Sequence, residues 1–189
     1  MAEKYNKNNV APVPPMGWNS YDYYNTTVNE EQVRKNAEYV SKNLKQYGWE
    51  YIVIDIQWSD PDAGKCNEQG LQYIPFSRFC IDCYSRQIPA PNRFPSSANG
   101  AGFKPLADYI HSLGLKFGIH IMRGIPRIAC HEHLPIKTHD GTKITANEIA
   151  NPFSISKWNS DMYGLDSSKK YAQDYYDSCF ELYAQWGVD

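Results

Sequence analysis

Three short clusters of polar and aromatic residues could carry chemistry, because each lies at the end of a run of residues typical of a strand. They occupy residues 18–21, 55–58 and 120–123. In the second cluster, Asp55 comes directly after the apolar run at residues 51–54. A carboxylate buried at the end of such a strand costs free energy unless it is paired or used. We therefore predict that Asp55 binds a ligand; the alternative is a buried carboxylate that accepts hydrogen bonds from loop amides.

Aromatic side chains are abundant in this sequence and accompany two of the clusters. They make up 14% of the residues, with 15 Tyr and 5 Trp. Trp18, Tyr21 and Trp58 could stack on a sugar ring, because these side chains combine a flat apolar face with a polar edge. The alternative is that their rings fill the core, and the sequence leaves both interpretations open.

The third cluster contains a histidine and an arginine. His120 lies in an apolar run, where a hydrogen-bonded core histidine is the common case, and Arg123 follows shortly after it. Arg123 could bind an anion or a sugar hydroxyl, or it could pair with a loop carboxylate. We predict that both residues contribute polar contacts to the site that contains Asp55.

The cysteines suggest a zinc site, but the set of ligands is incomplete. Cys66, Cys80 and Cys83 lie in one long loop, and a Cys-His-Glu-His segment occupies residues 130–133. A structural zinc site needs four ligands at characteristic spacing, and the second Cys-x-x-Cys pair is missing. An odd total of five cysteines is also unlike a disulfide framework. We therefore predict free thiols in loops, with no metal and no other cofactor.

The elements that must position the clusters alternate between strands and helices. Strands are predicted near residues 15–21, 51–56 and 115–121, with the first step of a fourth at residues 188–189. Apolar residues at helical spacing predict helices that begin after Asn29, near residue 103 and at Ser167. Asn29 and Gln32 form a capping-box pattern, and Gly48 and Gly187 are typical helix stops.

The lengths of the connections indicate the fold class. Segments from helix to strand are two or three residues long, whereas residues 57–102 and 122–166 form long loops after strands. Long loops at the carboxyl ends of parallel strands build the active site of a (β/α)8 barrel. The rival is an open doubly wound sheet, but no Gly-rich phosphate turn follows the first strand.

The length of the chain limits how much of such a barrel it can form. A complete barrel needs about 250 residues, and this chain has 189. We therefore predict an α/β fold in which residues 1–189 are the amino-terminal part of a TIM (β/α)8 barrel. This part would comprise strands 1 to 3 with their helices and the start of strand 4.

Composition excludes several classes of partner. The net charge is −2 without long runs of either sign, which argues against a nucleic-acid partner. No apolar run approaches the roughly 20 residues of a membrane span. The polar first residues lack the apolar centre of a secretory signal. We expect a cytoplasmic protein, or a secreted or periplasmic one whose leader has been removed.

Four segments, in the correct order, resemble glycoside hydrolase family 27, the α-galactosidases and α-N-acetylgalactosaminidases. Residues 14–20 (Pro-Pro-Met-Gly-Trp-Asn-Ser) look like the family's first strand, residues 51–58 like the second, residues 114–120 like the third, and residues 185–189 like the approach to the fourth. The resemblance implies a retaining glycosidase that acts on chain ends of small sugars or oligosaccharides. In the family, the fourth strand carries the aspartate nucleophile and a second aspartate further on is the acid/base, so we expect both beyond Asp189 and expect this chain alone to be inactive.

Three departures from the family pattern bear on specificity. The usual acidic pair at the second strand end is Asp55-Ile56 here, the usual tyrosine at the third is His120, and the usual second tryptophan is Tyr21. In α-galactosidases the acidic pair binds hydroxyls on the C4 and C6 side of galactose. Ile56 removes one acceptor and adds bulk where a hydroxymethyl group would lie. The resemblance therefore implies a preference for β-L-arabinopyranosides over α-D-galactosides.

Two further functions stay open at this point. One is a non-catalytic carbohydrate-binding relative of the family, and the other is an unrelated parallel α/β protein with zinc bound in a loop. An unpaired strand edge also predicts self-association, as a homo-oligomer or an aggregate.

Overall fold

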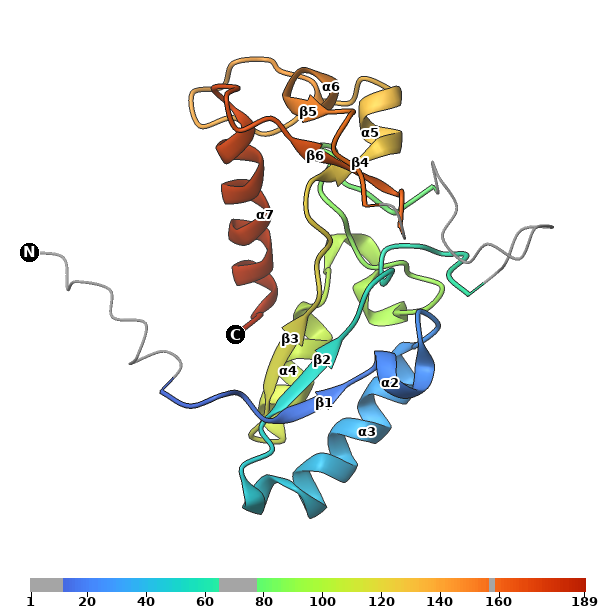
Figure 1. Ribbon diagram of the computed structural model, residues 1–189. Helices are drawn as coiled ribbons and strands as arrows, with labels where there is room; N and C mark the ends of the chain where they lie inside the picture. Colours follow the sequence, from blue (N-terminus) through green and yellow to red (C-terminus); the bar gives the residue numbers. More distant parts are fainter. Residues whose placement is uncertain (1–11, 65–77, 157–158) are drawn as a thin grey trace, which may run out of the picture.

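The protein is built around three parallel strands. The computed structural model describes residues 12–64, 78–156 and 159–189. The strands are β1 (Gly17–Asn19), β2 (Tyr51–Ile54) and β3 (Lys116–Ile119), hydrogen-bonded in the order β1-β2-β3. Figure 1 shows them side by side, with all three arrows pointing away from the tight connections that precede β2 and β3. The sequence predicted all three, although β2 and β3 each end two residues earlier than expected.

Two helices cover one face of this sheet. Helices α3 (Glu30–Asn43) and α4 (Lys104–Ser112) contact β2 and β3 respectively, as well as each other. Because side chains alternate along a strand, this face receives Ile52, Ile54 and Phe117, which are all 0% exposed. The opposite face carries half-buried residues, namely Tyr51, Val53 and Gly118. The sheet therefore has one fully packed face and, within the described part of the chain, one open face.

Capping residues set the helix boundaries as predicted. The Asn29 side chain accepts a hydrogen bond from the Gln32 amide, and the Gln32 side chain accepts one from the Asn29 amide, which completes the capping box of α3. After α3, a 3-10 turn, η1 (Lys45–Tyr47), leads to Gly48 in the left-handed conformation. Gly187 adopts the same conformation at the end of α7 (Ala172–Trp186), where glycine has no Cβ to strain the turn.

The last helix begins later than predicted. The sequence suggested Ser167 as its first residue, but α7 begins at Ala172. The Asp166 carboxylate accepts hydrogen bonds from both the amide and the hydroxyl of Ser168. Such a side-chain turn offers the backbone an alternative to the helix, so the chain makes turns before α7 starts.

Residues 122–166 are not the irregular loop that the sequence predicted. They form a small antiparallel sheet with the order β4-β6-β5, which Figure 1 shows beyond the carboxyl end of β3. Its elements are only two to five residues long, so the sequence contains no helical or strand periodicity that would predict them. They are β4 (Ile125–Pro126), α5 (Arg127–His131), α6 (Ala146–Ile149), β5 (Ala150–Asn151) and β6 (Met162–Leu165). Shorter helices also interrupt the earlier loops: α2 (Tyr21–Tyr24) and η2 (Pro95–Gly100).

The chain returns to the sheet at its last residue. The Asp189 amide donates to the Phe117 carbonyl at 3.0 Å, and the Phe117 amide donates to the Asp189 carboxylate at 2.8 Å. Residues 188–189 thus lie beside β3, where the start of a fourth strand was predicted, although they do not yet form one. The described residues make a mixed α/β structure without a closed barrel. None of their helices combines the length and apolar character that a bilayer crossing requires.

Candidate functional site

The register of the sheet brings three polar side chains to its open face. Asn19 pairs with Val53, and Val53 pairs with Gly118. Asp55 and His120 follow Val53 and Gly118 by two positions, and the His120 amide donates to the Ile54 carbonyl at 2.8 Å. Since every second residue faces the same way, Asn19, Asp55 and His120 share one face at the carboxyl ends of neighbouring strands. That end of a parallel sheet is where α/β proteins place their ligands.

These side chains line a groove of about 350 Å³. Four of its lining residues are among those predicted from the sequence; the full lining is Asn19, Tyr21, Asp22, Asp55, Ile56 and His120. The volume of a single pyranose ring is well below the volume of this groove. The groove therefore offers two carboxylates, an amide, a phenol and an imidazole to one small ligand.

Hydrogen bonds hold the Asp55 carboxylate in a fixed orientation. Its Oδ2 accepts from Asn19 Nδ2 at 2.8 Å, and its Oδ1 accepts from the Ile56 amide at 2.7 Å. The Tyr21 amide donates to Asn19 Oδ1 at 2.8 Å, which fixes the Asn19 amide with its nitrogen toward Asp55. A carboxylate oxygen has more than one lone pair, so Asp55 can still accept from a ligand hydroxyl. Asn19 was missed from the sequence, although it belongs to the same motif as Trp18.

Ile56 and Tyr21 complete the walls of the groove with opposite exposure. Ile56 is 4% exposed and forms an apolar wall beside Asp55, whereas Tyr21 in α2 is 40% exposed. The groove thus joins an acceptor and an apolar surface on adjacent residues of one strand end. A ligand that carries both hydroxyls and apolar C–H groups would suit this pairing.

Two tryptophans predicted as walls of the site lie elsewhere. Trp18 points to the helix-covered face with its strand partner Ile52, and its ring packs edge-on against Tyr24 at 6.1 Å. Trp58 is 2% exposed and packs against Phe103 at 5.4 Å and Trp186 at 6.2 Å. The interpretation of these rings as core filler is therefore the correct one. Trp58 still affects the site indirectly, because its Nε1 donates to the His120 carbonyl at 2.8 Å.

Arg123 also lies outside the groove. It is exposed, and its guanidinium donates to Ser154 Oγ at 3.0 Å. The chain leaves the sheet after Ile119, so residue 123 has moved toward the small antiparallel sheet and no longer follows the strand direction. The prediction that Arg123 joins His120 in one site is corrected accordingly.

The thiols do not gather into a metal site in the part of the chain that the structure describes. Cys83 is exposed, Cys130 and Cys179 are buried, and no group of three or more His, Cys, Asp or Glu side chains there could hold an ion. Burial raises the pKa of Cys130 to about 12, which keeps this thiol protonated. Cys66 lies outside the described residues.

Arg93 is a buried residue that no sequence pattern indicates. It is 9% exposed, and desolvation lowers its pKa to about 10. Its guanidinium donates to the carbonyls of Thr26 and Val28 after β1, at 2.6 and 2.8 Å, and to those of Gln57 and Asp60 after β2, at 2.5 and 2.9 Å. One side chain therefore ties together the two loops that lie beside the groove.

Asp161 is a second buried charge that the sequence did not reveal. It is 2% exposed, and its Oδ2 accepts from Gln57 Nε2 at 2.9 Å. Burial raises the pKa of this carboxyl to about 6, with Asp60 adding to the rise and Arg127 opposing it.

We expect Asp161 to make the protein less stable as its carboxyl ionises. Because its pKa is raised on folding, its contribution to stability is complete below the unfolded pKa of 3.8 and is lost as pH rises to about 6. The loss amounts to about 2 to 3 kcal/mol at neutral pH. Thermal unfolding of Asp161→Asn should show a higher midpoint than wild type at pH 7.5 and no gain at pH 4. The exposed Asp177→Asn is the control, and equal midpoints for both variants at pH 7.5 would contradict the expectation.

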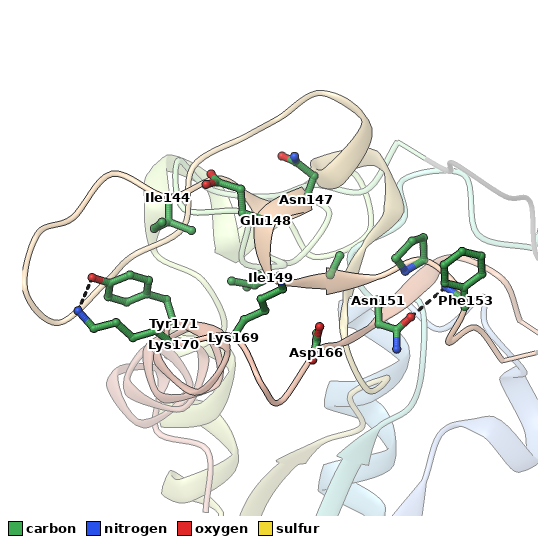
Figure 2. A pocket seen from close by; sticks show the side chains of 12 residues that line it. Ile144, Asn147, Glu148, Ile149, Asn151, Phe153, Asp166, Lys169, Lys170 and Tyr171 are labelled. Atoms are coloured by element: carbon green, nitrogen blue, oxygen red, sulfur yellow. Dashed lines mark hydrogen bonds between the residues drawn. The ribbon is translucent and has the colours of Figure 1, made fainter.

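A larger cavity lies away from the parallel sheet. It has a volume of about 610 Å³ and lies between α6, β5 and the start of α7. Figure 2 shows Tyr171, Lys169, Glu148 and Asp166 around it. None of the residues predicted for the site lines this cavity, and its Lys170 is already hydrogen-bonded to Tyr171 and ion-paired with Asp140. The groove at Asp55 is therefore the better candidate for the functional site.

Comparison with known proteins gives similarity over nearly the whole chain. No family model matches it. The α-galactosidase 3 of Arabidopsis thaliana is 30% identical over 176 residues, which cover 93% of this chain and 30% of the relative. The α-galactosidase of Cyamopsis tetragonoloba is 32% identical over 141 residues, or 71% of this chain and 28% of the relative.

Solved structures are more similar still. A β-L-arabinopyranosidase of glycoside hydrolase family 27 from Geobacillus stearothermophilus, known in complex with arabinose, is 58% identical. It superposes with a TM-score of 0.87, over 96% of this chain and 40% of that one. A Bacillus halodurans protein described as a candidate α-N-acetylgalactosaminidase gives 59% identity and a TM-score of 0.84, over 94% of this chain and 40% of that one. The chain therefore spans well under half the length of these relatives.

Proposed function

Because this chain belongs to glycoside hydrolase family 27, we propose that the whole protein is a retaining, exo-acting glycosidase that prefers β-L-arabinopyranosides to α-D-galactosides. Its substrate is a terminal sugar of a small glycoside or oligosaccharide. The chain contributes the part of the site that recognises the sugar hydroxyls.

One observation carries this proposal: Asp55 and His120 face the same groove from adjacent strand ends. The groove is small, and Asp55 is held by Asn19 so that it presents an acceptor. Sugar hydroxyls need such fixed acceptors, since a buried hydroxyl without a partner costs about 1–3 kcal/mol. Similarity to an arabinopyranosidase over 96% of the chain supports the same sugar class.

Ile56 is the residue proposed to select between the two sugars. β-L-Arabinopyranose has the ring configuration of galactose but lacks the C6 hydroxymethyl group. The apolar wall of Ile56, which lies directly after Asp55 and lines the groove, would exclude that group and offer its hydroxyl no partner. The preference therefore rests on a missing acceptor as well as on bulk.

The catalytic carboxylates are proposed to lie beyond Asp189. A retaining mechanism uses two carboxyl groups about 5–5.5 Å apart, one as nucleophile and one as acid/base. The Asp189 carboxylate is engaged by the Phe117 amide and by His111 Nε2, both at 2.8 Å. Phe117 lies near the amino end of β3, whereas Asp55 and His120 lie at the carboxyl ends. Asp189 is thus unsuited to be the nucleophile, and residues 1–189 alone should lack hydrolase activity.

The fold proposed for the whole protein is a (β/α)8 barrel. The half-buried face of the sheet, which carries Tyr51, Val53 and Gly118, would become the barrel interior. The backbone hydrogen bond from Asp189 to Phe117 would begin the fourth parallel strand. Both features support residues 1–189 as the amino-terminal part of such a barrel.

The specificity proposal is tested by giving the groove its second acceptor. We expect wild-type enzyme to hydrolyse 4-nitrophenyl β-L-arabinopyranoside with a higher kcat/KM than the α-D-galactopyranoside. Ile56→Asp should shift the ratio of the two kcat/KM values toward the galactoside by about 10- to 100-fold, because the C6 hydroxyl gains a partner worth about 1–3 kcal/mol.

Two further variants separate charge from bulk. Ile56→Ala enlarges the groove without adding an acceptor and should shift the ratio in the same direction by a smaller factor. Ile56→Val removes one methylene and should leave the preference within about threefold of wild type. The role of Ile56 would be refuted if the wild-type enzyme already prefers the galactoside and if neither Ile56→Asp nor Ile56→Ala changes the ratio of the two kcat/KM values.

A further inference from the structure

A second, much smaller cavity shares His120 with the groove. Its volume is about 10 Å³, and His120 and Ile56 line both this cavity and the groove. Gln57, Asn159 and Asp161 also line it, and they are 7%, 1% and 2% exposed. A volume of this size is about that of one water molecule.

Four buried polar atoms on residues lining this cavity have no hydrogen-bond partner among the described residues. They are Gln57 Oε1, His120 Nδ1, Asn159 Nδ2 and Asp161 Oδ1. Buried polar groups are almost always hydrogen-bonded, because each one left unsatisfied is costly. Four such atoms around a single space therefore indicate a common partner.

The donor and acceptor roles of three of these atoms are fixed by their neighbours. Gln57 Nε2 donates to Asp161 Oδ2, so Gln57 presents its oxygen to the cavity. Asn159 Oδ1 accepts from the Asp161 amide, so Asn159 presents its nitrogen. When ionised, Asp161 can only accept. The cavity thus contains two acceptors, one donor and the Nδ1 atom of His120.

We infer that this cavity binds one water molecule and that the water makes Asp161 a positioning residue for His120. A water molecule donates two hydrogen bonds and accepts two. Its hydrogens serve Asp161 Oδ1 and Gln57 Oε1, and one of its lone pairs accepts from Asn159 Nδ2. The remaining lone pair requires a donor, so His120 carries its proton on Nδ1. Its Nε2 is then an acceptor, available in the groove to a sugar hydroxyl.

Asparagine at position 161 reverses this assignment. Its oxygen would accept from Gln57 Nε2 as Asp161 Oδ2 does, so its NH2 group would face the cavity as a second donor. The water would then accept from Asn159 and from residue 161, and it would have a hydrogen left for His120 Nδ1. His120 would move its proton to Nε2 and present a donor to the groove. Protonation of Asp161 on Oδ1 has the same effect, so the tautomer of His120 depends on whether the Asp161 carboxyl is ionised. The titratable or charged groups around this carboxyl are Asp60, Arg127 and His120 itself.

The test is the tautomer of His120 in the full-length protein labelled with 15N-histidine, recorded at pH 8. The His120 signals are assigned from the spectrum of His120→Asn. We expect a proton on Nδ1 in wild type and on Nε2 in Asp161→Asn, while the exposed Asp177→Asn keeps the wild-type tautomer. The same tautomer in wild type and Asp161→Asn, or a wild-type proton on Nε2, would overturn the inference.

A second measurement does not depend on any variant. A high-resolution crystal structure of the wild-type protein should show one water within hydrogen-bond distance of His120 Nδ1 and of at least two of Gln57, Asn159 and Asp161. An empty cavity, or direct bonds among these atoms, would refute the water site. Neither the tautomer spectrum nor the crystal structure requires a sugar, so their outcomes are independent of the proposed glycosidase activity.

The part of the inference that rests on the proposed function is the effect on the sugar. Loss of one hydrogen-bond acceptor in the groove should raise KM for the arabinopyranoside about tenfold in Asp161→Asn, which corresponds to ~1.4 kcal/mol. The value of kcat should change less than threefold, since Asp161 does not contact the reacting atoms. An unchanged KM together with a changed tautomer would remove His120 Nε2 from sugar binding and leave the water site intact.

Discussion

Replacing Arg93 by methionine is expected to lower the free energy of unfolding by about 4 kcal/mol. The methionine fills similar space but leaves the carbonyls of Thr26, Val28, Gln57 and Asp60 without their donors. A buried polar group that loses its partner costs about 1–3 kcal/mol, and the four costs overlap because the loops can partly relax toward water. Chemical denaturation monitored by circular dichroism measures the change.

Two further variants test whether the loss of stability in Arg93→Met comes from the hydrogen-bonding geometry of the guanidinium and not only from its charge. Arg93→Lys keeps the charge, but a single ammonium cannot reach carbonyls on two loops at once, so it should recover less than half of the loss. Lys35→Met removes an exposed cation whose partner, Glu31, is 74% exposed, and it should leave the free energy of unfolding close to the wild-type value. A loss below 1 kcal/mol for Arg93→Met would show that the two loops do not depend on this residue.

For the complete protein, the proposed function predicts that Asp55→Asn reduces kcat/KM for β-L-arabinopyranosides about 100-fold. The substitution removes a charged acceptor worth about 1.5–3 kcal/mol to a ligand hydroxyl. It also turns one acceptor into an NH2 group, which conflicts either with the donor Nδ2 of Asn19 or with the Ile56 amide. Steady-state kinetics with the nitrophenyl glycoside gives the value directly.

The matched control for Asp55 is Asp108→Asn on the exposed surface of α4, where the carboxylate pairs with Lys104 along the helix. Its kcat/KM should remain within about twofold of wild type. Thermal unfolding of both variants separates a binding defect from a folding defect. An Asp55→Asn enzyme with at least one third of wild-type kcat/KM would rule out Asp55 as the principal hydroxyl acceptor.

Much of the fold could be predicted because its strands and helix ends carry local signals. The apolar run before Asp55 identified β2, and the capping box at Asn29 identified the start of α3. The small antiparallel sheet could not be predicted, since β4 and β5 have two residues each and β6 (Met-Tyr-Gly-Leu) lacks a β-branched run like that of β2. The late start of α7 depends on a side-chain hydrogen bond at Asp166, which competes with the helix.

The site was predictable where it depends on strand ends and unpredictable where it depends on the register. Asp55, Ile56, Tyr21 and His120 were identified and line one groove. Trp18 was assigned wrongly because the direction of alternation decides whether it or Asn19 faces the groove, and the sequence does not fix that direction. Arg93 and Asp161 have no sequence signal, because their partners are backbone carbonyls and residues up to 104 positions away.

The two-residue alternation of the sheet has a consequence for how this protein can tolerate changes in chain length. Asn19, Asp55 and His120 share a face only because each stands an even number of positions from a neighbour in register. Deleting one residue within β2 would turn Asp55 toward the helices and a core isoleucine toward the groove. Deletions or insertions in the long segments after the strands leave that parity untouched. Relatives with other specificities can therefore be expected to differ in the length of those segments while keeping the spacing within each strand.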